Sequence, residues 1–134
     1  MIVVDTNIIS YLYLTGEHSV QAEKLLRADP EWAAPLLWRS EFRNVLALYL
    51  QKRILSFESI LSILDEAESL MGENEYEVSS LAVMDLVTKS TCSAYDCEFV
   101  TAAQDLRVPL ITTDRNILEQ FPDTAFSPDE YLRY

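Results

Sequence analysis

The feature that most constrains the fold is a pattern found near both ends of the chain: an apolar run, then an acidic residue, then a helical segment. Residues 1–4 lead into Asp5, and residues 108–113 lead into Asp114. Such runs are typical of buried strands in parallel sheets, which are covered on both faces. Helices alternate with strands between them, so the sequence predicts an α/β fold with about five short parallel strands and right-handed crossovers.

Helix-stop and helix-start signals divide the middle of the chain. Amphipathic helices are predicted over residues 37–52 and 57–71, and Ser93 is a favourable N-cap for a helix that ends near Leu106. Because there is no linker or internal repeat, residues 1–134 are expected to form one domain with its own core. The remaining strands are predicted in three short segments, at residues 32–35, 75–78 and 124–126.

Composition favours a globular protein of the cytoplasm. The chain is 49% hydrophobic and has only two glycines. No apolar run approaches the ~18–20 residues of a membrane span, and no basic segment precedes the first strand, so we expect neither a membrane helix nor a signal peptide. Cys92 and Cys97 match no zinc or disulfide pattern, and they are expected to be buried free thiols in a reducing compartment.

The net charge of −12 comes from 22 acidic and 10 basic residues. It excludes a general nucleic-acid coat protein, which needs a basic surface. It is compatible with acids that are held by cations, or with a basic protein partner.

Asp5 and Asp114 are the first candidate site residues. The carboxyl ends of parallel strands meet at one edge of the sheet, where ligands bind, so the two acids lie side by side if their strands are neighbours. The alternative is that each acid only caps the following helix.

Glu41 and Asp96 lie at unusual positions in predicted helices. Glu41 is at the margin of an apolar face, and its alternative role is an ion pair with Lys52 or a place beside the core. Asp96 lies within an apolar stripe, where an acid has to be capped, paired or bound to a metal. Its alternative role is a capping box with Ser93.

Other polar residues carry less information. Asp85 lies on a helix without a clear apolar face, and the only histidine, His18, is expected to be solvated. The acids at positions 65, 66 and 68 form a charged helix face.

Four carboxylates without accompanying histidines or thiolates have a specific use. Hard oxygen ligands suit Mg²⁺ or Mn²⁺ rather than zinc. Such sites activate water and stabilise charge on a phosphoryl group, often with two metal ions ~4 Å apart.

The order and spacing of these motifs resemble the PIN-domain nucleases, and the size most resembles the VapC toxins of bacterial and archaeal toxin–antitoxin pairs. The resemblance covers essentially the whole chain. The motifs that carry it are Asp5-Thr6-Asn7, Glu41 within the segment 39–46, Tyr95-Asp96, and Leu110-Ile111-Thr112-Thr113-Asp114.

The resemblance implies a three-layer α/β/α sandwich whose five-stranded parallel sheet has the order 3-2-1-4-5. It also implies a Mg²⁺- or Mn²⁺-dependent endoribonuclease in which metal-activated water cleaves RNA to 5′-phosphate and 3′-hydroxyl ends. The implied catalytic and metal-binding residues are Asp5, Glu41, Asp96 and Asp114. The implied supporting residues are Thr6 and Asn7, which orient Asp5, and Thr112, which fixes the last acid.

Further implications concern partners. The family implies a homodimer and an antitoxin whose carboxy-terminal segment reaches the acids, with no nucleotide cofactor. Cys97 departs from the small alanine that is common at its position, and we expect it to be tolerated. Candidate groove residues are Tyr11, Leu12, Tyr13 and Trp38, for which burial in the core is the alternative. Candidate RNA contacts are Arg39, Arg43, Lys52, Arg53 and Arg115.

Two alternatives belong to other classes. One is a catalytically silent PIN-like scaffold that binds a protein. The other is a receiver-like domain, which also gathers acids at strand ends but needs adjacent acids after the first strand, where this chain has Asp5-Thr6.

Overall fold

The computed structural model describes residues 1–133, and within them the strands form a five-stranded sheet. Each neighbouring pair is parallel and the order is β3-β2-β1-β4-β5. The predicted α/β fold and strand order are confirmed, and a receiver-like domain, with its order 2-1-3-4-5, is excluded. The strands are β1 (Ile2–Val4), β2 (Trp32–Pro35), β3 (Glu75–Tyr76), β4 (Leu110–Ile111) and β5 (Ala125–Phe126).

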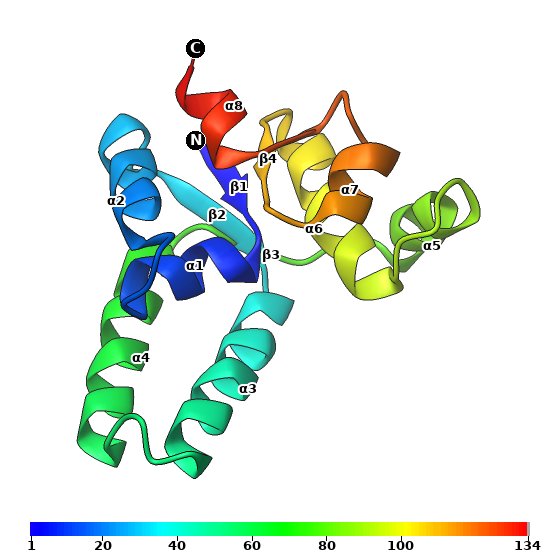
Figure 1. The fold of residues 1–134 in the computed structure, drawn as a ribbon. Coiled ribbons are helices and arrows are strands. Elements are labelled where there is room, and N and C mark those ends of the chain that lie inside the picture. Colours follow the sequence, from blue (N-terminus) through cyan, green and yellow to red (C-terminus); the bar gives the residue numbers. More distant parts are fainter. Residues whose placement is uncertain (134) are drawn as a thin grey trace.

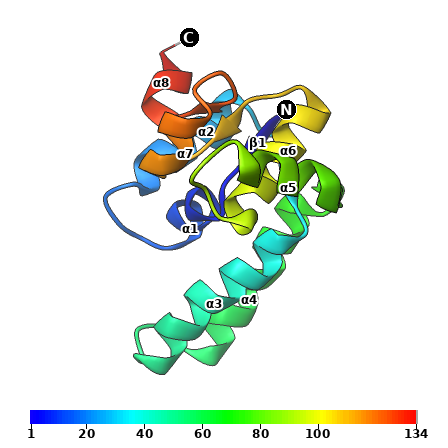
Figure 2. The same ribbon diagram turned by 90° about the vertical axis from the view of Figure 1, so that its right-hand side faces the viewer.

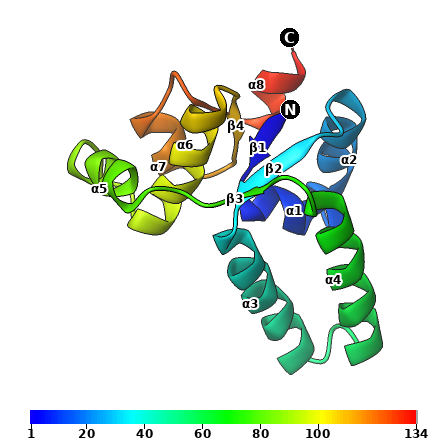
Figure 3. The ribbon, with the colours of Figure 1, turned by 180° about the vertical axis from the view of Figure 1, so that it is seen from behind.

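Helices cover both faces of the sheet and complete the three layers (Figure 1). α1 and α2 lie to one side, and α6 and α7 to the other, as the view from behind also shows (Figure 3). The helices are α1 (Thr6–Tyr13), α2 (Ser19–Ala28), α3 (Leu37–Gln51), α4 (Phe57–Met71), α5 (Ser80–Thr88), α6 (Ala94–Leu106), α7 (Arg115–Gln120) and α8 (Pro128–Leu132).

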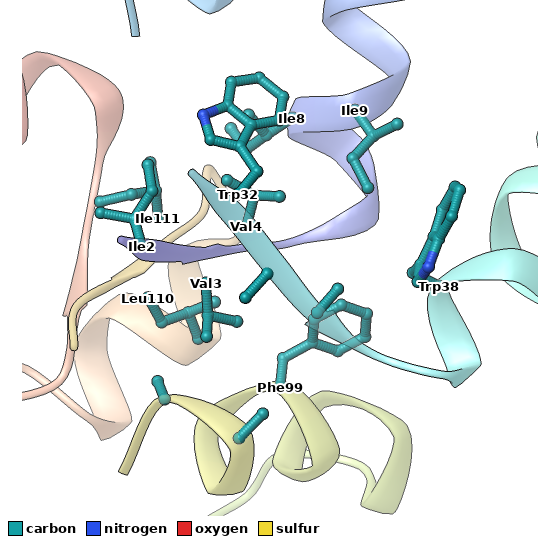
Figure 4. Close-up of a cluster of buried hydrophobic side chains, with 14 of the residues drawn as sticks. Ile2, Val3, Val4, Ile8, Ile9, Trp32, Trp38, Phe99, Leu110 and Ile111 are labelled. Atoms are coloured by element: carbon teal, nitrogen blue, oxygen red, sulfur yellow. The ribbon is translucent and has the colours of Figure 1, made fainter. Parts of the chain in front are cut away.

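The core forms on the two faces of β1. Successive side chains of a strand point to opposite faces, so Val4 lies with Ile8 of α1, while Val3 points with Leu110 toward Phe99 of α6 (Figure 4). All of these side chains are fully or almost fully buried. The central strand is therefore held from both sides, and its carboxyl end is fixed in space.

α3 and α4 form a hairpin that projects from the body of the molecule (Figure 2). The base of the hairpin is anchored by Trp38, which is fully buried and donates its indole N–H to Glu75 Oε2 at 2.9 Å. Near its tip, Ile54 and Phe57 are 60% and 57% exposed. The hairpin thus presents apolar surface away from the core.

Boundaries differ from the prediction mainly at strands. The run 108–113 contributes only Leu110–Ile111 as β4, because Pro109 has no N–H to donate and the neighbouring β5 is itself two residues long. The predicted helix over residues 57–71 matches α4, and Ser93 caps α6 as expected. Cys92 and Cys97 are buried and free. Within residues 1–133, none of the helices is both long and apolar enough to cross a membrane.

Candidate active site

Asp5 and Asp114 lie at the carboxyl ends of neighbouring strands, as predicted. Asp5 directly follows β1, Asp114 lies three residues after β4, and these strands pair. Both acids are also N-caps: Asp5 Oδ1 accepts from the Thr6 N–H at 2.8 Å, and Asp114 Oδ1 accepts from the Ile117 N–H at 3.0 Å. Each acid therefore lies at the carboxyl edge of the sheet and also caps the helix that follows it, so the two interpretations are not exclusive.

Thr112 links these two acids. Its hydroxyl donates to Asp5 Oδ2 at 2.7 Å and accepts from the Asp114 N–H at 3.0 Å. Thr112 is fully buried, so water does not compete for these bonds. One side chain thus orients the carboxylate of Asp5 and the backbone that carries Asp114.

Glu41 reaches the same edge from α3. It is half-buried, and its Oε1 accepts from the Thr6 hydroxyl at 2.7 Å. Lys52, the alternative partner, forms no ion pair among the described residues. Glu41 is therefore held beside the site by a residue adjacent to Asp5.

Asp96 is positioned by the first turn of α6. The Ser93 hydroxyl accepts from the Asp96 N–H at 3.1 Å, which is the capping bond expected from the sequence. The side chain is half-buried and borders the same cavity as the other three acids. The cap again fixes the acid without removing it from the site.

The four acids face a cavity of about 650 Å³ at the carboxyl edge of the sheet. No lysine or arginine is among the described residues that line it. The lining comes from the start of α1, the segment before α2, one side of α3 and the two acids Asp96 and Asp114. It also contains the predicted supporting residues Thr6 and Asn7.

Burial and mutual repulsion perturb these carboxyl groups. Burial raises the pKa of Asp5 to about 6, although hydrogen bonds from Thr112 and Thr6 oppose the rise. Burial also raises the pKa of Glu41 and of Asp96, and the charge of a neighbouring acid adds to each: Asp96 acts on Glu41, and Asp114 acts on Asp96. A site that concentrates negative charge in this way binds protons or cations.

The donor set fits a hard divalent cation. Carboxylate oxygens are the ligands that Mg²⁺ and Mn²⁺ prefer. Within residues 1–133, no group of three or more His, Cys, Asp or Glu side chains is placed so that it could hold a metal ion in a cage of protein ligands. Mg²⁺ does not need such a cage, because it is commonly bound through one or two carboxylates and keeps several water ligands. The buried Asn7 Oδ1, in the lining of the cavity, has no hydrogen-bond partner and is free to accept from such a water.

Of the two residues expected to orient Asp5, only Thr6 is hydrogen-bonded to it. Thr6 contacts Asp5 through its backbone and uses its hydroxyl for Glu41. Asn7 Nδ2 instead donates to Thr113 Oγ1 at 3.0 Å, a bond that crosses from α1 to the segment after β4. Thr113 was not predicted as a site residue, because only the tertiary structure shows that α1 meets this segment.

Arg39, a candidate RNA contact, forms ion pairs within the protein. Its guanidinium pairs with Glu75, with Nε 2.6 Å from Oε2, and with Glu68. These bonds tie α3 to β3 and α4, and they hold the pKa of Glu75 below its usual range. The other four basic candidates are exposed and lie outside the cavity lining: Arg43, Lys52, Arg53 and Arg115.

His18 and Asp85 also have definite places. His18 packs against Tyr11, with ring centroids 4.4 Å apart, and both residues line the cavity, while the His18 side chain remains 42% exposed to solvent, in agreement with the prediction. Asp85 is exposed and pairs with Lys89 at 2.7 Å, away from the site. The contact of His18 with Tyr11 could not be predicted from the sequence, because Tyr11 lies in α1 and His18 at the start of α2, and a loop joins the two helices. Glu98, whose charge raises the pKa of Glu41, was also not predicted from the sequence.

Comparison with known proteins agrees with this geometry. Ribonuclease VapC3 of Pyrobaculum aerophilum is 29% identical over 125 residues, which cover 90% of this chain and 95% of the relative. The crystal structure of FitAcB from Neisseria gonorrhoeae superposes with a TM-score of 0.76 at 15% identity, covering 96% of this chain and 98% of that one. A toxin–antitoxin complex from Klebsiella pneumoniae gives 0.69 at 20% identity, with coverage of 96% and 98%.

The solved structures establish the fold, and the family match extends along the sequence. The model of the PIN-domain family matches residues 2–125, which include both strand-end acids as well as Glu41 and Asp96. The chain therefore belongs to the PIN-domain family.

Proposed function

We propose that this protein is an endoribonuclease that depends on Mg²⁺ or Mn²⁺. The observation that carries the proposal is the convergence of four carboxylates, from two strand ends and two helices, on one cavity. The 29% identity to a protein named as a ribonuclease supports RNA as the substrate.

In this proposal Asp5, Asp96 and Asp114 would hold the cation, directly or through its water ligands, and Glu41 would hold either the cation or a water molecule bound to it. When bound, the cation lowers the pKa of water and neutralises charge on the phosphoryl group. The hydroxyls of Thr112 and Thr6 keep Asp5 and Glu41 in fixed orientations, since each donates at 2.7 Å to one oxygen and leaves the other carboxylate lone pairs available.

The products follow from the direction of attack. Water attacks phosphorus and the 3′ oxygen leaves, so the ends are a 5′-phosphate and a 3′-hydroxyl. The ribose 2′-hydroxyl takes no part, and the site offers no histidine pair that would activate it; His18 is the only histidine. Glu41, which is half-buried beside the other three acids, would accept the proton that water releases.

Cleavage of RNA by the purified protein tests the proposal. Asp96→Asn is expected to lower the rate by roughly 100-fold or more, because loss of even an outer-shell partner of a metal site lowers activity by about 10–100-fold. Asp85→Asn is the matched control, since this exposed acid pairs only with Lys89. Full activity of Asp96→Asn or in excess EDTA, or cyclic 2′,3′-phosphate ends, would contradict the mechanism.

We also propose that a basic antitoxin segment binds and inhibits the protein. Support comes from the structural relative described as a toxin–antitoxin complex, from the net charge of −12, and from the apolar tip of the α3–α4 hairpin. Trp38 is excluded from the groove because it is fully buried, and Tyr13 packs against Phe42, whereas Tyr11 lines the cavity.

Co-expression with the adjacent reading frame tests this partner. A stable complex is expected, and Phe57→Glu should weaken it, while Val20→Glu on α2, equally exposed, should not. A lone protein that cleaves RNA without harming the cell would contradict the toxin role. We further propose that the protein is a homodimer. A second apolar surface supports this, because Leu81 and Met84 of α5 are 83% and 53% exposed. Light scattering measures the mass of the particle in solution and so distinguishes a dimer from a monomer.

A further inference from the structure

The cavity extends well beyond the four acids. Its lining also includes residues of α1 and of the segment that leads to α2, among them Tyr11 and His18 (the start of α2 lies beside α1 in Figure 1). Its volume of about 650 Å³ is within the ~300–1,000 Å³ range of sites that enclose a ligand of small-molecule size. A scissile phosphate at the acids would therefore leave room for an adjoining nucleoside.

Tyr11 and His18 form an aromatic pair within this part of the cavity. Their ring centroids are 4.4 Å apart and the planes are inclined by 32°, so the two rings are in contact in a tilted arrangement. Both residues are only half-buried, so ring surface remains accessible from the cavity. His18 also lies 3.3 Å from the carboxylate of Glu17, which restrains the imidazole.

The aromatic pair is tied to the acid edge of the sheet. The Tyr11 hydroxyl and Thr113 Oγ1 are hydrogen-bonded at 3.0 Å, and Asn7 Nδ2 donates to the same oxygen at 3.0 Å. Thr113 directly precedes Asp114. The spacing between the aromatic pair and the acids is thus held by side-chain bonds as well as by the backbone.

The described lining of the cavity is acidic rather than basic, so contacts to the bases have to contribute to RNA binding. It includes the four acids and Glu17, and it contains no lysine or arginine. Basic side chains inside the cavity therefore do not supply the phosphate contacts that usually dominate RNA affinity. Aromatic rings supply another source of binding energy, because stacking on a base contributes ~1–3 kcal/mol and does not depend on phosphate charge.

We infer that Tyr11 and His18 are positioning residues that stack on one unpaired base next to the scissile phosphate. Unpaired bases in loops and ends can be splayed onto aromatic side chains, whereas paired bases in a duplex cannot. This inference rests on the proposed ribonuclease function, but it concerns which RNA enters the site rather than how the bond breaks.

The test compares binding of a short single-stranded RNA with that of copies in which one base at a time is removed. Binding is measured by fluorescence anisotropy with Asp96→Asn protein, so that cleavage does not interfere. Removal of one base is expected to weaken binding by about 5–150-fold, which corresponds to the stacking energy of one base. In a Tyr11→Leu/His18→Ala variant, intact and abasic RNA should bind equally.

A second readout separates stacking from a purely structural role of the pair. 2-Aminopurine at the sensitive position should be quenched by the protein that retains Tyr11 and His18 and not by the double variant, whose folding is checked by circular dichroism. Phe57→Leu, an exposed aromatic residue outside the cavity lining, is the control and should behave as the parent protein does.

The outcomes distinguish the two proposals. If RNA binds but no abasic position matters, or if the double variant retains the same sensitivity, the stacking inference is wrong while RNA cleavage by the parent protein still supports the ribonuclease. If the double variant does not fold, Tyr11→Phe with His18→Ala repeats the test, and unchanged sensitivity in it overturns the role of His18. If no RNA is bound or cleaved, both proposals are wrong.

Discussion

Asp5→Asn is expected to stabilise the metal-free protein at neutral pH. Asp5 is an acid whose burial raises its pKa from 3.8 to about 6, so the folded protein holds this proton more tightly than the unfolded chain. The stability due to the protonated group is fully present below about pH 4 and is lost as the pH rises through about 6. At 1.36 kcal/mol per pKa unit, a shift of about two units corresponds to about 3 kcal/mol lost at neutral pH.

Asparagine removes the charge but keeps most of the local structure. Its single side-chain oxygen can still accept from the Thr112 hydroxyl. The bond from the Thr6 N–H is lost, at a cost of about 1 kcal/mol. The variant should therefore be more stable than the wild type by about 2 kcal/mol near neutral pH in EDTA, and less stable by about 1 kcal/mol near pH 4, where only the loss of the Thr6 bond remains.

Urea unfolding at about pH 4 and about pH 7.5, followed by circular dichroism, measures this difference directly. Asp65→Asn is the matched control, since Asp65 lies exposed on α4, and it should change stability by less than about 0.5 kcal/mol at both pH values. The reasoning is refuted if Asp5→Asn is destabilising near neutral pH, or if its effect is the same at both pH values.

Three further predictions concern the surroundings of the site. Thr112→Val removes the donor to Asp5 and should lower stability by about 1–2 kcal/mol and RNA cleavage by at least about tenfold; retained cleavage would show that this bond is dispensable. Arg39→Gln removes the ion pairs with Glu75 and Glu68, leaving Glu75 with only the bond from Trp38, and should lower the free energy of unfolding by about 2 kcal/mol with little effect on cleavage, whereas Arg43→Gln should change neither; loss of cleavage at intact folding would indicate that Arg39 contacts RNA. Mg²⁺ at 100 times its dissociation constant should stabilise the wild type by about 2.7 kcal/mol in thermal scans and the Asp5→Asn protein by much less; equal shifts would indicate a cation site elsewhere.

The sequence was most informative where topology alone brings residues together. Asp5 and Asp114 each follow an apolar strand, and a parallel sheet places such positions on one edge once the strands are neighbours. Glu41 and Asp96 could be singled out because helical periodicity sets them against apolar neighbours. Their partners were partly predictable: Ser93 lies three residues before Asp96, while the Thr6 hydroxyl that holds Glu41 is 35 residues away.

Contacts between side chains that are distant in the sequence could not be predicted from it. Arg39 meets Glu75 only because α3 packs beside β3, so it resembled a free basic residue until the fold was known. His18 approaches Tyr11 through the loop between two helices, and no periodicity describes such a loop. β3 and β5 are two residues long, which is too short for a strand pattern to fix their ends.

A crystal of the protein soaked in Mn²⁺ tests the central claim most directly, because the anomalous signal locates the ion without reference to activity. We predict a manganese peak in the cavity, in contact with carboxylate oxygens of Asp5, Asp96 or Asp114, and no such peak in Asp96→Asn crystals under the same conditions. A cavity without manganese, at concentrations that support RNA cleavage, or manganese bound only elsewhere on the molecule, would contradict it.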